Sequence, residues 1–156
     1  ALGVAAEPGA LRDAKAVDWD WSTRLFDHVE LHAGDYTESV RFYEAVLEPL
    51  GIPKIAADIV DDGEGAYTCF TNLNVVDRRP PTQNLHLCFF ARSREQVDGF
   101  HAAGVAAGFR SNGEPGYRDY APGYYAAFLL DPDGNNVEAL YRDVDNPGHG
   151  ADERLR

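Results

Sequence analysis

Two histidines and one glutamate stand in three strand-like runs whose other residues are mostly apolar. His28 lies in the run FDHVELH, His86 in NLHLCFF, and Glu138 in NVEAL. An unpaired carboxylate among apolar neighbours costs several kcal/mol to bury, and a bound cation would remove that cost. Two imidazoles and one carboxylate can hold a divalent metal and leave coordination positions open. The sequence therefore predicts a metal site, with a metal-free pocket lined by the same residues as the alternative.

The faces of these runs follow from the alternation of side chains along a strand. In the second run, Cys88 and Phe90 share the face of His86, and in the last run Asn136 shares the face of Glu138. In each of the three runs the opposite face is wholly apolar, which suits packing under a helix. We expect the polar faces to line the concave side of a curved sheet.

The elements that position these runs occur twice in the same order. Residues 36–50 and 94–107 have apolar residues at helical spacing, and each stretch is followed by a glycine. Asp35 and Ser93 are expected to cap these helices at their N-termini. Each half then continues with two or three strands, of which the hairpin at 124–141, turning at DPDGN, is the clearest. Two such halves are expected to complete a curved sheet with the helices on its back.

The domain organisation is a single domain with two loose ends. Residues 1–24 form an extension in which Trp19 and Trp21 are candidates for a contact with a second subunit. The domain covers 25–142 and contains modules at about 26–77 and 84–142, and the tail is 143–156. Residues 111–122, rich in glycine, proline and tyrosine, are expected to form a long functional loop.

Charge and composition exclude some classes of partner. The net charge is −12, so the chain lacks the basic face that nucleic acid requires, and it would be repelled by an acidic membrane. No apolar run approaches the ~18 residues of a membrane helix. The two cysteines have no Cys-x-x-Cys spacing, and the composition fits a reducing cytoplasm.

With these residues in place, the chain resembles the vicinal oxygen chelate superfamily, which includes glyoxalase I, extradiol dioxygenases, fosfomycin-resistance enzymes and bleomycin-resistance proteins. The resemblance covers residues 26–142 and rests on FDHVEL, SVRFY, HLCF and, most specifically, LDPDGNNVE. It implies an α+β fold in which two βαβββ modules form a cupped mixed sheet with helices on the convex face. It also places His28, His86 and Glu138 at the positions of the metal ligands.

One departure from glyoxalase I bears on activity. That enzyme has a fourth ligand, a glutamate, on the last strand of its first module. Here the strand expected at residues 66–71 has no acid, and Glu64 lies before it in a turn. The departure counts against classical four-ligand glyoxalase I activity. Ligand type alone does not choose among Fe, Mn, Ni, Co and Zn.

The resemblance implies a divalent-metal-dependent enzyme acting on a small substrate with vicinal oxygens, either a glyoxalase-like lyase or isomerase or an extradiol-type dioxygenase. The alternative is a bleomycin-type antibiotic-binding resistance protein without catalysis, and a third possibility is a member that binds metal without turnover. A homodimer is expected by resemblance.

Further candidate site residues flank the predicted ligands. Either Tyr124 or Tyr125 is expected to face the cup, beside Glu138, as a proton donor. His101 is expected on the polar side of the second helix, outside the site. The candidates for substrate binding are Cys88, Phe90, Arg118 and Tyr120, with Arg118 suited to an anionic group.

Overall fold

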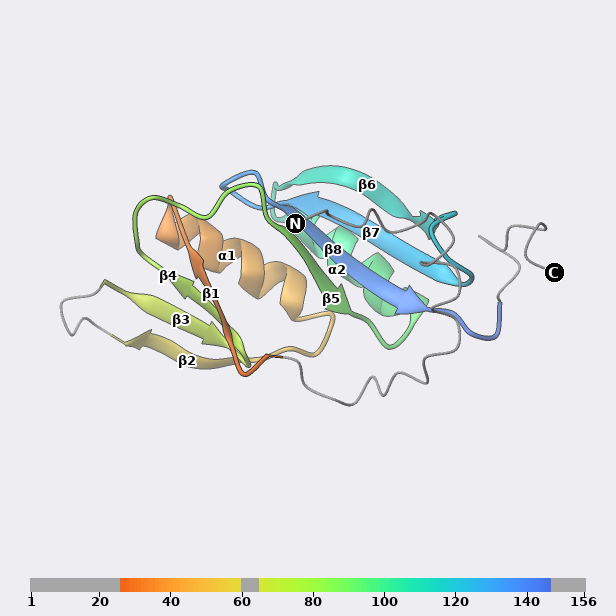
Figure 1. Cartoon of the computed structure of the whole chain (residues 1–156), viewed down its shortest axis with the longest axis horizontal. Coiled ribbons are helices and arrows are strands. Elements are labelled where there is room, and N and C mark those ends of the chain that lie inside the picture. Colours follow the sequence, from red (N-terminus) through yellow and green to blue (C-terminus); the bar gives the residue numbers. More distant parts are fainter. Residues whose placement is uncertain (1–25, 60–64, 147–156) are drawn as a thin grey trace, which may run out of the picture.

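The computed structural model describes residues 26–59 and 65–146, within which the order of elements repeats once (Figure 1). The first module contains β1 (Val29–His32), α1 (Tyr36–Leu47), β2 (Lys54–Ile59), β3 (Tyr67–Phe70) and β4 (Leu73–Val76). The second contains β5 (His86–Phe90), α2 (Arg94–Ala106), β6 (Arg110–Tyr117), β7 (Tyr124–Leu130) and β8 (Asn136–Arg142). The extension predicted at 1–24, with Trp19 and Trp21, lies outside the described residues.

Each module forms its own four-stranded mixed sheet. The strand order is β1-β4-β3-β2 in the first sheet and β5-β8-β7-β6 in the second. In both sheets the first strand runs parallel to the last, and the other pairs are antiparallel. The predicted α+β class and the two βαβββ modules are confirmed. In the part of the chain that is described, the two sheets remain separate.

The two helices begin where their capping residues predict. The Asp35 side chain accepts a hydrogen bond from the backbone N–H of Glu38 at 3.1 Å, and Ser93 accepts one from Gln96 at 3.3 Å. These bonds satisfy N–H groups that have no partner within the helix. Helix α1 ends at Leu47, three residues earlier than expected. Neither described helix is long and apolar enough to cross a membrane.

One hydrophobic core serves both modules. It combines the inward residues of both sheets with apolar residues from both helices, and α1 packs directly against α2. Leu31 of β1 and Val137 of β8 are both fully buried in this core. Because side chains alternate along a strand, the other face of each sheet points away from the shared core. The polar faces predicted from sequence are these outward faces.

A strand replaces part of the predicted loop at 111–122. Strand β6 covers Arg110–Tyr117 and pairs with β7, although its register shifts on both sides of Gly113. Pro115 has no N–H to donate, and proline is tolerated in a sheet where the strand lies at the edge. Strand β6 is such an edge strand, so its composition resembled a loop.

The end of the first module also differs from expectation. The strand expected at 66–71 is β3, and the chain then turns at Thr71, whose φ is +55°, into an additional strand, β4. Glycine usually occupies such a left-handed position, and its absence hid the turn. The last strand of the first module is therefore β4, with the sequence LNVV.

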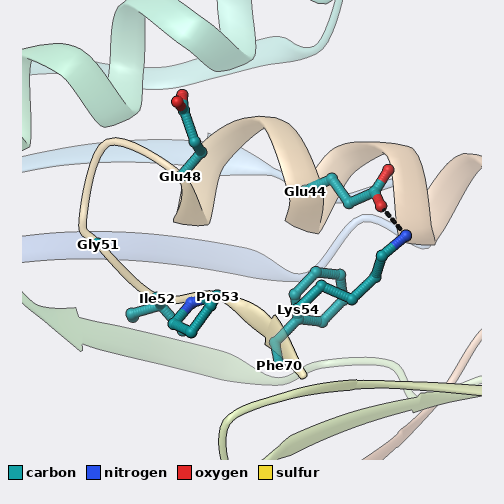
Figure 2. A pocket seen from close by; sticks show the side chains of 7 residues that line it. All are labelled: Glu44, Glu48, Gly51, Ile52, Pro53, Lys54 and Phe70. Carbon is teal, nitrogen blue, oxygen red and sulfur yellow. Dashed lines mark ion pairs between the residues drawn. The ribbon is translucent and has the colours of Figure 1, made fainter. Parts of the chain in front are cut away.

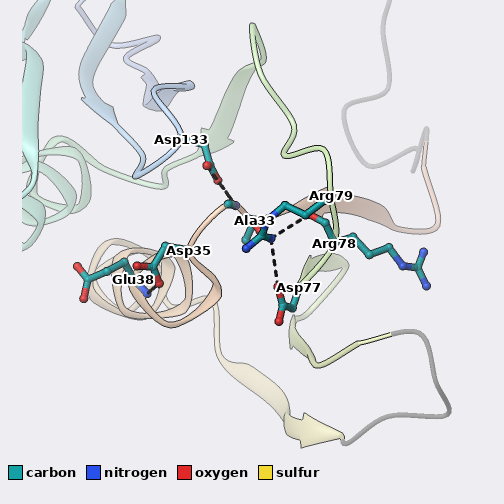
Figure 3. A network of polar contacts seen from close by, with 8 residues as sticks. Ala33, Asp35, Glu38, Asp77, Arg78, Arg79 and Asp133 are labelled. Atoms are coloured by element: carbon teal, nitrogen blue, oxygen red, sulfur yellow. Dashed lines mark hydrogen bonds and ion pairs between the residues drawn. The ribbon is translucent and has the colours of Figure 1, made fainter.

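Polar contacts join the turn after β1 to the linker and to the β7–β8 turn (Figure 3). The Asp133 carboxylate accepts the backbone N–H of Gly34 at 2.9 and 3.1 Å. Arg79 of the linker donates to the Ala33 carbonyl oxygen and to Asp77. A Cβ at Gly34 would lie 2.2 Å from Asp133 Oδ1, so a larger residue at this position would push the carboxylate away from the backbone N–H.

We predict that Asp133→Ala lowers the free energy of unfolding by about 1–2 kcal/mol, because the Gly34 N–H loses a charged acceptor. Asp145→Ala is the control, since it removes the same charge from an exposed side chain. Urea unfolding followed by circular dichroism measures both variants. Equal stabilities for the two variants would show that the contact contributes nothing.

Candidate functional site

The outward face of the second sheet, called the open face below, brings His86, Glu138 and Tyr124 together. Glu138 lies on β8, between β5 and β7, and its side chain is only 1% exposed. Its Oε2 is 2.9 Å from Nε2 of His86, and its Oε1 accepts the Tyr124 hydroxyl at 2.6 Å. Both carboxylate oxygens are therefore engaged, and the His86 side chain remains 52% exposed.

The surroundings of Glu138 keep neighbouring groups protonated. Burial, together with the hydrogen bond to Glu138 and its negative charge, raises the pKa of Tyr124 well above its usual range. Cys88 is exposed as a residue, but partial loss of solvent around its sulfur and the same carboxylate raise the pKa of its thiol. The Arg142 guanidinium lies 4.8 Å from the centre of the Tyr124 ring and acts in the opposite direction. At neutral pH, Tyr124 is thus a hydrogen-bond donor to the carboxylate.

Asn136 contacts the imidazole of His86 on the side away from Glu138, and Asn112 in turn holds Asn136. Asn136 Nδ2 lies 2.7 Å from Nδ1 of His86, and Asn112 donates to Asn136 Oδ1 at 2.9 Å. A partner on the second ring nitrogen commonly fixes the orientation of a metal-binding histidine. Strand alternation placed Asn136 on this face, but Asn112 fell in the presumed loop and gave no signal.

His28 does not join this group within one chain. It precedes β1 on the first sheet, its side chain is 60% exposed, and its Nδ1 lies 2.8 Å from Asp27. Across residues 26–59 and 65–146, no three His, Cys, Asp or Glu side chains are placed to hold a metal together. Of the three predicted ligands, His86 and Glu138 of the second sheet are in contact, and His28 beside the first sheet does not complete a three-residue group with them.

Comparing the two modules shows which residue of the first module stands at the position of the fourth ligand of glyoxalase I. In the second sheet Cys88 of β5 pairs with Glu138, and in the first sheet Glu30 of β1 pairs with Asn74 of β4. Asn74 thus stands where the second module has its glutamate, and its Oδ1 accepts the Cys69 thiol. A neutral carboxamide replaces the carboxylate of a four-ligand site, which agrees with the departure predicted from sequence.

The two candidate tyrosines lie on different faces of β7. Tyr124 is on the open face, whereas Tyr125 points toward α2 and donates a hydrogen bond to Asp98 at 2.7 Å. Burial and the Asp98 contact raise the pKa of Tyr125 to about 12. Tyr125 belongs to the helix-covered side, and the structure does not bring it to Glu138.

The candidates for substrate binding lie on or beside the open face. Cys88 and Phe90 lie on the same face of β5 as His86, at every second position. Both are exposed, with Phe90 at 67%. Tyr120 is 71% exposed and stacks edge-on against Tyr124 with ring centres 5.3 Å apart. A hollow of about 210 Å³ opens next to them, lined by Asn112, Gly113, Arg118, Tyr120, Phe128 and Asn136.

A larger hollow, of about 450 Å³, lies elsewhere, between the end of α1 and the start of β2 (Figure 2). Ile52, Pro53 and Phe70 form its apolar wall, and Lys54 is paired with Glu44 across it. It holds no histidine or cysteine, and none of the predicted site residues lines it. The smaller hollow is therefore the one associated with the candidate chemistry.

His101 was placed incorrectly by the sequence. It is 6% exposed, and its Nε2 lies 2.8 Å from the Ser111 hydroxyl of β6. The polar side of α2 is covered at this point by an edge strand that the sequence did not reveal. His101 joins α2 to β6 and lies outside the open face.

We predict that Tyr124→Phe destabilises the metal-free protein by about 1–3 kcal/mol, because a buried carboxylate oxygen loses its donor. Tyr120→Phe, which removes a hydroxyl from an exposed ring, should change stability little. Thermal and urea unfolding of the two variants measure the difference. A Tyr124→Phe protein as stable as Tyr120→Phe would contradict the role given to this hydrogen bond.

Comparison with known proteins agrees with this architecture. The family model of the glyoxalase/bleomycin resistance protein/dioxygenase superfamily matches residues 25–139. A solved glyoxalase/bleomycin resistance protein from Albidiferax ferrireducens T118 is 36% identical, with a TM-score of 0.60, covering 76% of this chain and 99% of that one.

Two more distant structures share the fold. A lactoylglutathione lyase from Agrobacterium tumefaciens is 21% identical over 76% of this chain and 94% of its own, with a TM-score of 0.52. The oxidase ChaP-H2 is 22% identical over 83% and 99%, with a TM-score of 0.55. No curated protein matches the chain. The family match and the 36% identical structure together show that the chain belongs to the glyoxalase/bleomycin resistance protein/dioxygenase superfamily, the vicinal oxygen chelate superfamily.

Proposed function

We propose that the chain is a divalent-metal-dependent vicinal oxygen chelate enzyme whose metal site is shared between two copies. His86 and Glu138 of one copy would supply two ligands, and His28 of the second copy the third. The observation that carries the proposal is the His86–Glu138 pair, a nearly fully buried carboxylate beside a half-exposed imidazole on an outward face.

The chemistry of this pair suits a metal. A buried carboxylate is costly unless its charge is compensated, and here its partners are one imidazole and one neutral phenol. Imidazole nitrogen and carboxylate oxygen suit Fe, Mn, Co, Ni and Zn. Asn136 contacts Nδ1 of His86 and so leaves Nε2 directed toward Glu138, on the side where a metal would bind. Among these five metals the donor set does not choose.

A second copy is proposed because the three ligands lie on two outward faces. In a twofold dimer, the first sheet of one subunit can face the second sheet of the other, and the symmetry creates two equivalent sites. Phe26 beside His28 and Phe90 on the open face are 62% and 67% exposed. Exposed large apolar side chains on both surfaces favour such a contact.

In such a site, individual residues of the chain would have different roles. A bound divalent metal supplies Lewis acidity toward two adjacent oxygens of a small substrate. Tyr124 holds its proton at Oη and donates it in a hydrogen bond to Glu138, which fixes the direction of the carboxylate. With the neutral Asn74 in place of an acidic fourth ligand, more coordination positions would stay open for substrate. Glyoxalase-like lyase or isomerase chemistry and dioxygenase chemistry both remain compatible with this arrangement.

An antibiotic-binding protein without catalysis is the second candidate. The net charge of −12 and the exposed aromatic rings of Phe90 and Tyr120 favour a cationic, partly aromatic ligand such as bleomycin. Titration with bleomycin in the presence of a chelator separates the candidates. Tight binding that is unaffected by His86→Ala would support sequestration over metal-dependent catalysis.

We predict about one transition metal per chain, as expected for two equivalent sites in a dimer. His28→Ala, His86→Ala and Glu138→Ala should each lose it, because each removes a ligand. His32→Ala is the matched control, since its imidazole instead contacts Glu30. Inductively coupled plasma mass spectrometry after reconstitution measures the content. Failure of the unmodified protein to retain any of the five metals would overturn the enzyme proposal.

Mixing two variants that each fail to bind metal tests whether the metal site is shared between two chains. A hybrid dimer of His28→Ala and His86→Ala chains carries one site with both substitutions and one intact site. After denaturation and joint refolding, the random mixture should therefore bind about one metal per four chains. A site contained in one chain predicts no recovery in this mixture. Light scattering should show a dimer mass for each variant.

A further inference from the structure

The side chain of Arg118 lies along the open face beside the candidate metal ligands. Its backbone N–H bonds the Tyr124 carbonyl oxygen at 2.8 Å, which places Arg118 next to Tyr124 across the edge of the second sheet. From there the side chain runs back along β6, and its guanidinium lies 5.5 Å from the centre of the Phe128 ring. Phe128 pairs directly with Glu138 on the neighbouring strand.

Two glycines of β6 make room for this guanidinium. A Cβ at Gly116 would lie 3.0 Å from Nη1 of Arg118, and a Cβ at Gly113 would lie 3.5 Å from Nη2 and 2.8 Å from the Phe128 ring. Neither glycine has a left-handed φ, so backbone geometry does not require them. Gly116 instead leaves room for the guanidinium, and Gly113 leaves room for the Phe128 ring on which the guanidinium lies.

Two backbone carbonyl oxygens hold the Arg118 guanidinium in place, but no carboxylate in the described part of the chain neutralises its charge. Nη1 donates to the Tyr117 carbonyl oxygen at 3.2 Å and Nη2 to that of Glu114. Within the described residues, no carboxylate lies within ion-pair distance of Arg118. A guanidinium has five N–H groups, of which these bonds use two, so the others remain available to a ligand. The chain as a whole has a net charge of −12, so a guanidinium without a carboxylate partner differs from the overall charge of the protein.

The hollow beside Arg118 leads toward the candidate metal ligands. Its lining includes Arg118, Tyr120, Phe128, Asn112 and Asn136. Asn136 also contacts His86. Because adjacent strands lie about 5 Å apart, a small molecule can reach from the guanidinium to the Glu138 strand. The hollow thus brings together a cation and an aromatic surface beside Asn136, which contacts His86.

We propose that Arg118 recognises an oxyanion, a carboxylate or a phosphonate, on the substrate. The substrate class is a small anionic molecule with a planar body, which packs against Phe128 and Tyr120, and with two vicinal oxygens at its far end. The vicinal oxygens rest on the proposed function, whereas the oxyanion contact does not. A cationic ligand such as bleomycin would meet Arg118 unfavourably, so this contact separates the two candidate functions.

Metal-free protein tests the oxyanion contact alone, with four planar probes followed by NMR chemical shifts. Benzoate and phenylphosphonate carry an oxyanion, benzamide is neutral and benzamidinium is cationic. At least one anionic probe should bind about tenfold or more tightly than benzamide, as charge-assisted hydrogen bonds allow. The tighter of the two anions identifies the oxyanion. Equal or tighter binding of benzamidinium would overturn the proposal.

Three variants assign the effect to Arg118. Arg118→Gln should reduce the preference for the anion about tenfold or more, and Arg92→Gln, which removes an exposed charge elsewhere, should leave it within about twofold. Gly116→Ala keeps the charge and moves the guanidinium by only a few tenths of an ångström, so it should reduce the preference for the anion much less than Arg118→Gln does. Thermal unfolding checks that each variant is folded. Unchanged anion binding in Arg118→Gln would refute the assignment.

The metal-loaded protein connects the contact to the vicinal oxygens. The probes are 3,4-dihydroxybenzoate and catechol, which share two adjacent oxygens and differ in one carboxylate. The carboxylate should improve binding about tenfold in the unmodified protein and not in Arg118→Gln. If no metal binds, the proposed function fails while the preference for benzoate survives. If metal binds but the carboxylate gives no advantage, the function stands and the oxyanion proposal fails.

Discussion

The structure depends on a constraint that acts on every strand, which can bury only one of its two faces in the core. Both modules direct their apolar faces into one core that also contains α1 and α2. The polar faces must then point outward, because an unpaired carboxylate cannot enter such a core. Because both apolar faces pack into one core, His86 is exposed on the outward face of the second sheet. His28 lies beside the other sheet, so the predicted ligands are divided between two surfaces of the molecule.

Local signals predicted much of the fold and half of the site. The repeat, both helix caps and the β7–β8 turn follow from neighbouring residues, and alternation placed His86 with Glu138. Strand β4 was missed because its turn uses Thr71 in place of glycine, and β6 because glycine and proline imitate a loop. Whether Tyr124 or Tyr125 accompanies Glu138 depends on the register of β7 against β8, which single-sequence reasoning did not determine.

A chain of polar side chains crosses the second sheet from edge to edge. It runs from Asn112 on β6 through Asn136 to His86 on β5, and from there through Glu138 to Tyr124 on β7. All four strands contribute at least one member, so the orientation of each group is set by several strands at once. Hydrogen bonds to several strands restrict the orientation of each member, and Glu138 at the centre of the network is buried. His86 and Glu138 therefore lie on strands of the sheet and not on loops.

The irregular course of β6 has a consequence for how the protein behaves in crowded solution. An edge strand offers unpaired backbone groups to other chains and can start lateral aggregation. Strand β6 shifts register on both sides of Gly113, and Pro115 has no N–H to donate. A foreign strand would find no regular ladder there. This edge therefore resists fibril-like growth, although the neighbouring face of the sheet exposes the aromatic side chains of Phe90 and Tyr120.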